Sequence, residues 1–141
     1  MNLFFDSSAL LKRYLNEKGT NEVKKLFEET DKVFVSAITQ IECASSLKRL
    51  FSTSYIDKTE CERLNIEMSL DFPFFETILF DEDTKHAALK VVDKYPMKAL
   101  ETIQLATLIC VANQIESFVV CDQKLKKYAL KEGFKIIDPT E

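Results

Sequence analysis

Two aspartates directly follow apolar runs of the kind that form buried β-strands. Asp6 comes after the run at residues 2–5, and Asp122 comes after the run at residues 119–121. In an open parallel sheet, ligands bind outside the carboxyl ends of the strands, where the chain leaves the sheet. The positions of Asp6 and Asp122 therefore predict two carboxylates at one edge of such a sheet.

Two glutamates stand near the starts of helical patterns. Glu42 lies in the first turns of the helix expected after a strand at residues 33–35. Glu101 lies at the start of an apolar helix that leads into the strand before Asp122. Both helices begin where a strand edge is expected, so we place the two glutamates at the same edge as the aspartates.

Each of these acids also has an ordinary structural explanation. Asp6 and Asp122 could serve as helix N-caps, and Thr39 with Glu42 fits a capping box. Glu101 could simply favour the positive end of its helix dipole. Four carboxylates in one cleft would nevertheless repel each other, and a hard cation such as Mg²⁺ or Mn²⁺ relieves that repulsion. Such a cation polarises a phosphoryl oxygen and promotes attack by water, which is the chemistry of phosphodiester hydrolysis.

Strand-like runs alternate with helical patterns along the whole chain. The expected strands are at residues 2–5, 33–35, 77–80, 117–121 and 134–137. The expected helices are near residues 8–15, 20–30, 38–50, 58–75, 82–94, 100–114 and 123–131. This alternation predicts a single α/β domain over residues 1–141, with a central parallel sheet of about five strands and helices on both faces.

Composition narrows the class of protein. The formal net charge of −4 does not support simple electrostatic adhesion to nucleic acid, although a metal ion could supply positive charge locally. Four cysteines without a CxxC pair indicate a reducing cytoplasm. No run approaches the length of a membrane helix, and the first residues do not resemble a signal peptide. We expect a cytoplasmic protein with no membrane partner.

Basic residues lie within about two helical turns of the acids. They could guide an RNA backbone to the site, or they could be solvated helix faces. Lys98 is the strongest candidate for a substrate contact because it lies one helical turn before Glu101. The set comprises Lys12, Arg13, Lys48, Arg49, Lys98 and the run at residues 124–127.

Four segments, taken together and in order, resemble the motifs of the PIN domain family, and within it the small VapC-type toxin ribonucleases. The segments are LFFDSSALLKRY at residues 3–14, VSAITQIE at 35–42, KALETIQLA at 98–106 and FVVCDQKL at 118–125. Each segment is weak evidence alone, but the set spans nearly the whole chain.

The resemblance implies a catalytic quartet that holds Mg²⁺ or Mn²⁺, namely Asp6, Glu42, Glu101 and Asp122. It also implies that the Ser8 hydroxyl bonds a metal-bound water or a ligand carboxylate. The chain departs from the family where Glu101 replaces the usual Asp and Gln104 the frequent His. Gln104 can form hydrogen bonds but cannot titrate near neutral pH.

The resemblance implies a divalent-metal-dependent endoribonuclease, the toxin of a type II toxin–antitoxin pair, with RNA as substrate. It further implies a small antitoxin protein as inhibitor and a homodimer. Glu101 and Gln104 keep an alternative open, in which a PIN-like module binds RNA or protein but hydrolyses nothing. A phosphoryl-transfer domain with Asp6 as nucleophile fits less well, because a second Asp is wanted where Ser8 stands.

Overall fold

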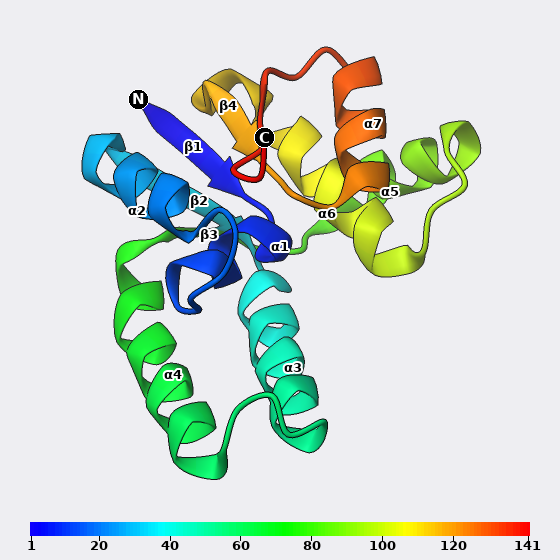
Figure 1. Ribbon diagram of the computed structural model, residues 1–141. Helices are drawn as coiled ribbons and strands as arrows, with labels where there is room; N and C mark the ends of the chain where they lie inside the picture. The colour runs from blue at the N-terminus through cyan, green and yellow to red at the C-terminus, as the bar shows by residue number, and fades with distance from the viewer.

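Five parallel strands form a central sheet in the order β3-β2-β1-β4-β5 (Figure 1). The computed structural model describes all residues from 1 to 141. The strands are β1 (Asn2–Phe5), β2 (Lys32–Ser36), β3 (Glu76–Ile78), β4 (Ser117–Val119) and β5 (Ile136–Ile137). Chain order reverses at β1, since β2 and β4 lie on its two sides, and such a switch point opens a crevice at the carboxyl ends of the strands.

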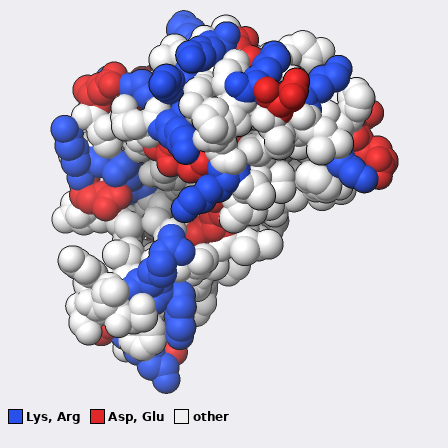
Figure 2. All heavy atoms as spheres, turned by 90° about the vertical axis from the view of Figure 1, so that its right-hand side faces the viewer, with Lys and Arg blue, Asp and Glu red and all other residues white.

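Seven α-helices surround this sheet, and three short 3₁₀ turns extend the chain between them. The helices are α1 (Ser7–Leu10), α2 (Thr20–Glu29), α3 (Thr39–Ser52), α4 (Lys58–Asp71), α5 (Glu82–Lys94), α6 (Ala99–Cys110) and α7 (Gln123–Lys131). The 3₁₀ turns are η1 (Leu11–Arg13), η2 (Phe72–Phe74) and η3 (Ala112–Gln114). Helices α3 and α4 project together beyond the sheet and form the narrow lower part of the molecule (Figures 1 and 2).

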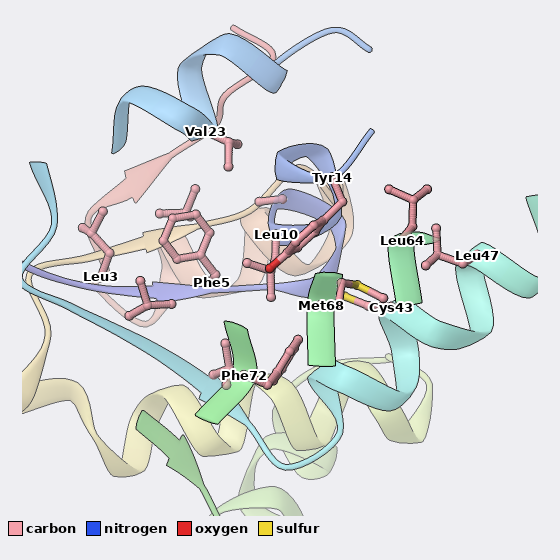
Figure 3. Packing of buried hydrophobic residues seen from close by; sticks show 14 of the residues in the cluster. Leu3, Phe5, Leu10, Tyr14, Val23, Cys43, Leu47, Leu64, Met68 and Phe72 are labelled. Carbon is pink, nitrogen blue, oxygen red and sulfur yellow. The ribbon is translucent and has the colours of Figure 1, made fainter. Parts of the chain in front are cut away.

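The two faces of the sheet bury separate hydrophobic clusters, because successive side chains of a strand point to opposite faces. Leu3 and Phe5 of β1 pack with residues from α1 to α4 on one face (Figure 3). Phe4 points to the other face and packs with residues from α5, α6 and α7. The predicted α/β domain with helices on both faces of a five-stranded parallel sheet is thus confirmed.

Several boundaries differ from those that the sequence predicts. The first helix gives way to the 3₁₀ turn η1 and ends at Arg13, and the helix expected to run to residue 114 ends at Cys110. The strand expected at residues 77–80 covers only Glu76–Ile78. Its last two expected residues, Leu79 and Phe80, are 71% and 49% exposed, so the apolar run there is not a buried strand.

The cysteines are free, but they are not uniformly buried. Cys43 and Cys61 lie in the core, whereas Cys110 is exposed. Cys110 stands in an apolar run, which favours burial as a small hydrophobe, but it occupies the outward face of the last turn of α6 and is exposed. None of the helices combines the length and the apolar character needed to cross a bilayer.

Candidate metal and nucleic-acid site

The four acids named from the sequence line one cleft at the carboxyl edge of the sheet. Asp6 follows β1, Asp122 precedes α7, Glu42 lies in the first turn of α3 and Glu101 in the first turn of α6. The cleft has a volume of about 630 Å³. Ser8, Lys98 and Gln104 line it as well, so the fold brings together all seven residues that the sequence singles out.

Asp6 is the most deeply placed of the acids, with 5% of its surface exposed. It caps α1, since its Oδ2 accepts a hydrogen bond of 3.1 Å from the backbone N–H of Ser8. The Ser8 hydroxyl donates to the same oxygen. Burial raises the pKa of Asp6, and the charge of Asp122 adds to that rise, while the hydrogen bonds from Ser8 oppose it.

Ser8 joins the ends of two neighbouring strands. Its Oγ accepts hydrogen bonds from the backbone N–H groups of Cys121 at 3.0 Å and Asp122 at 3.2 Å, while its own hydrogen goes to Asp6. The residues joined are 113 and 114 positions apart in the chain. Of the two roles expected for this hydroxyl, the structure shows the bond to a carboxylate.

Asp122 and Glu101 also act as caps. Asp122 Oδ1 accepts from the backbone N–H of Leu125 at 2.8 Å, and Glu101 Oε2 accepts from the backbone N–H of Lys98 at 3.1 Å. The structural role does not exclude a functional one, because each carboxylate has a second oxygen and up to about four lone-pair sites. The extra methylene of Glu101 lets its carboxylate reach back to the residue before the helix.

Glu42 behaves differently from the capping-box prediction, which is wrong. The N-cap of α3 is Ile38, and Thr39 instead accepts through Oγ1 from the backbone N–H of Ser36 at 3.1 Å. Glu42 Oε1 is buried and has no hydrogen-bond partner. Burial, followed by the charge of Asp6, raises the pKa of Glu42 to about 7.

Gln104 is the second polar side chain left without a partner. It is only 1% exposed, and neither its Oε1 nor its Nε2 makes a hydrogen bond. A buried amide in this state costs free energy, so unpartnered polar atoms at a cleft are a sign of an absent ligand, ion or water. The sequence singles out Gln104 only through the family motif, and its burial becomes apparent only in the fold.

The donor set fits a divalent cation. No group of three or more His, Cys, Asp or Glu side chains is arranged to hold a metal ion directly. Mg²⁺, however, commonly uses one or two protein carboxylates and completes its octahedron with waters. The unpartnered Glu42 oxygen and the four carboxylates around one cleft supply such ligands.

Two basic residues share this cleft with the four acids: Arg49 of α3 and Lys98 at the start of α6. Figure 2 shows basic side chains on both sides of a recessed acidic patch above the lower part of the molecule. Other basic residues near the motifs are paired elsewhere, Lys12 with Glu17 and Arg13 with Asp71.

Ser45 and Ser46 also line the cleft, although the sequence motifs do not single them out. Their spacing was the available signal, because residues three and four positions after Glu42 lie on the same side of a helix. A larger cavity of about 960 Å³ lies between α2, α3 and α4, away from the four acids.

Comparisons with known proteins agree with this architecture. The family model described as PIN domain matches residues 3–131. A search of curated proteins gives no match.

Solved structures of low sequence identity share the fold. A toxin–antitoxin complex from Klebsiella pneumoniae aligns with a TM-score of 0.70 and 18% identity over 99% of this chain and 98% of that one. FitAcB from Neisseria gonorrhoeae gives 0.71 and 16%, over 97% of each chain. VapC20 from Mycobacterium tuberculosis, described as a sarcin–ricin loop cleaving toxin, gives 0.68 and 13%, over 94% of this chain and 95% of that one.

Proposed function

Because the chain belongs to the PIN domain family, we propose that it is a divalent-metal-dependent endoribonuclease acting in the cytoplasm. The observation that carries the proposal is the convergence of four carboxylates on one cleft, where Glu42 keeps a buried oxygen without a partner. Burial and mutual repulsion disfavour ionised carboxylates there, as the raised pKa values of Asp6 and Glu42 indicate. A bound cation reverses that preference.

Mg²⁺ or Mn²⁺ would be held between Asp6, Glu42, Glu101 and Asp122, with one or two of these carboxylates bound directly and the others through waters. When bound, the cation supplies neutralisation of the charge that develops on the phosphate and lowers the pKa of the attacking water. The chain contributes rigid ligand positions. Ser8 fixes the Asp6 carboxylate, and the α7 cap fixes Asp122.

The same proposal includes a role as the toxin of a toxin–antitoxin pair. Support comes from structural relatives described as a toxin–antitoxin complex and as a sarcin–ricin loop cleaving toxin. We propose RNA as substrate, a small antitoxin protein as inhibitor and a homodimer as the active form. These assignments follow from the family, whereas the cleft itself supports only the metal-dependent chemistry.

Cleavage of structured RNA with Mn²⁺ or Mg²⁺ tests the nuclease activity, using protein purified free of any co-expressed partner. We expect wild type to cut, EDTA to stop it, and Asp6→Asn and Asp122→Asn to be inactive. Asp57→Asn is the matched control, because Asp57 also caps a helix, with Oδ1 accepting from the Glu60 backbone N–H at 2.7 Å, but lies outside the cleft.

Calorimetric titration with Mn²⁺, combined with the cleavage assay, separates this proposal from a non-hydrolysing PIN-like module. The engagement of Glu101 in the α6 cap favours that alternative, since a carboxylate used by the backbone is less free to move toward a metal. If wild type binds Mn²⁺ but, like both variants, cleaves none of many tested RNAs, the nuclease proposal is wrong. The binding module then becomes the better description.

A further inference from the structure

Arg49 is the arginine of this chain that has no carboxylate partner. The sequence contains three arginines. Arg13 lies 3.8 Å from Asp71, and Arg63 lies 2.6 Å from Glu60 and 3.1 Å from Glu67. No acid lies within ion-pair distance of Arg49, although four acids line the same cleft. Its charge is therefore available to a ligand that enters the cleft.

Two serines hold the Arg49 guanidinium in place. Nη1 donates to Ser45 Oγ and Nη2 donates to Ser46 Oγ, each at 2.9 Å. All three side chains line the cleft. A serine hydroxyl orients a guanidinium without neutralising it, and a guanidinium has five N–H donors, so several remain for a ligand. The guanidinium fork, meaning the two terminal N–H groups of Arg49, is thus oriented before a ligand binds and keeps its full charge.

The position of this fork relative to Glu42 suggests which part of a substrate it meets. Ser45 and Ser46 lie about one helical turn beyond Glu42, or roughly 5 Å along the axis of α3. The guanidinium therefore sits beside the carboxylates and does not lie among them. A group bound there flanks the group that reacts at the acidic quartet.

We propose that Arg49, oriented by Ser45 and Ser46, binds a backbone phosphate of the substrate RNA next to the phosphate that is cleaved. The assignment rests on the proposed function in naming RNA as the substrate. A planar guanidinium matches phosphate oxygens bidentately, which a lysine ammonium cannot do. Lys98, at the start of α6 on the same cleft, adds a second and less directional positive charge.

The chemistry of the cleft favours a phosphate chain as its occupant. Four acids against two cations would repel a polyanion unless a divalent cation were bound at the acids. Arg49 would add attraction at its own place in the cleft, beside the acids. The fork therefore strengthens RNA binding in the ground state and the transition state alike, which changes KM and leaves kcat nearly unchanged.

Fluorescence anisotropy of a labelled, mixed-sequence single-stranded RNA measures this contribution directly. The background is Asp6→Asn, so that binding is followed without cleavage. We expect Arg49→Ala to weaken binding roughly 10-fold or more, the loss typical of a charge-assisted contact. The slope of log affinity against log salt should fall by about 0.7, the value for one phosphate on a single strand.

Three further variants make the test specific. Lys48→Ala removes the same charge one position away, from a side chain that lies over the Phe51 ring and outside the cleft, and it should change affinity less than about twofold. Arg49→Lys keeps the charge but loses the fork, so its affinity should be intermediate. Ser45→Ala with Ser46→Ala keeps the charge unoriented and should also be intermediate.

Equal losses in Arg49→Ala and Lys48→Ala would overturn the inference, since general electrostatics would then explain both. It also fails if an acidic peptide, and not RNA, loses affinity on Arg49→Ala, because the ligand would then be a protein carboxylate. The nuclease proposal can fail separately. A protein that cleaves nothing but still loses RNA affinity selectively at Arg49 would retain this subsite as a binding site.

Discussion

Three of the four carboxylates in this cleft cap helices. Asp6, Asp122 and Glu101 each cap a helix through one oxygen atom. The cap fixes the carboxylate on a rigid element, which is the condition for placing a ligand atom with little freedom. Glu42 has no such backbone contact and is the acid with a raised pKa of about 7.

The Ser8 hydroxyl connects the Asp6 carboxylate with the backbone N–H groups of Cys121 and Asp122. We expect Ser8→Ala to lower the free energy of unfolding by about 1–3 kcal/mol, because the N–H groups of Cys121 and Asp122 lose their acceptor and are partly buried. Urea denaturation measures the difference. Ser69→Ala is the control, because the Ser69 hydroxyl is exposed and contacts only carbonyls of its own helix. Equal effects in the two variants would contradict the bridging role.

At the scale of elements, the start of α6 is capped by an acid that the sequence also predicts to bind a cation. Glu101 accepts from the backbone N–H of Lys98, while the middle of α6, Thr102 and residues 104–108, is buried. The backbone needs only an acceptor at this position, whereas a cation needs a charge. Replacing the Glu101 carboxylate by an amide separates these two requirements, because the amide keeps the acceptor oxygen and loses the charge.

We expect Glu101→Gln to keep stability within about 0.5 kcal/mol, because the amide oxygen still caps the helix, and to weaken Mn²⁺ binding. Glu101→Ala should lose both metal affinity and about 0.5–2 kcal/mol of stability. Thermal unfolding in EDTA and calorimetric Mn²⁺ titration measure the two effects. Unchanged Mn²⁺ affinity in Glu101→Gln would show that this acid only caps α6.

The segment after β5 is tied to α7 through Asp138. Lys126 Nζ and Gln123 Nε2 each donate to Asp138 Oδ2 at 3.1 Å, and the Thr140 hydroxyl donates to Oδ1 at 2.6 Å. Burial alone would raise the pKa of Asp138, but these hydrogen bonds outweigh it and hold the pKa below the ordinary value of 3.8. The ionised form is thus the one that the fold stabilises.

This contribution to stability is present above pH 3.8 and is lost as the pH falls toward the depressed value. We expect Asp138→Asn to be less stable than wild type at pH 7, and the gap to narrow between pH 5 and pH 2. Urea midpoints across that range measure the gap. Asp93→Asn, on the exposed side of α5, serves as control. A gap that stays constant with pH would mean that the charge of Asp138 is not the cause.

For the molecule as a whole, the sheet separates two hydrophobic clusters. Helices α3 and α4 extend the cluster on one of its faces. Leu47 of α3 and Leu64 of α4 are fully buried in the cluster that also holds Leu3 and Phe5 (Figure 3). The helix that carries Glu42, Ser45, Ser46 and Arg49 is therefore anchored by the packing of α4. Weakening α4 should affect the geometry of the cleft from a distance.

We expect Leu64→Ala to destabilise the protein by about 2–5 kcal/mol, through lost burial and the cavity that it leaves. Leu70→Ala on the same helix should change stability by less than about 0.5 kcal/mol, because Leu70 is 67% exposed. Denaturant titration compares the two. Similar losses would indicate that α4 buries a different face in solution.

The sequence by itself determined the architecture, since apolar periodicity and helix capping are local signals. β1 and α2 begin where the pattern predicts, and α5 and α7 match the predicted ranges at both ends, each starting after an aspartate N-cap. The expected positions of the four acids relative to strand ends followed from the same alternation. Parallel βαβ connections leave few ways to arrange such elements.

Tertiary structure alone decided how the side chains at the cleft are used. The Ser8 bridge joins residues 113 positions apart, and nothing local specifies it. The cap contact belongs to Glu101 and not to Glu42, although a capping-box pattern stands at Thr39 and Glu42. Arg49 keeps an unpaired charge because the packed fold brings no acid within ion-pair distance of its guanidinium. Hydrogen bonding, burial and charge pairing depend on distances between elements, and only the packed fold fixes those distances.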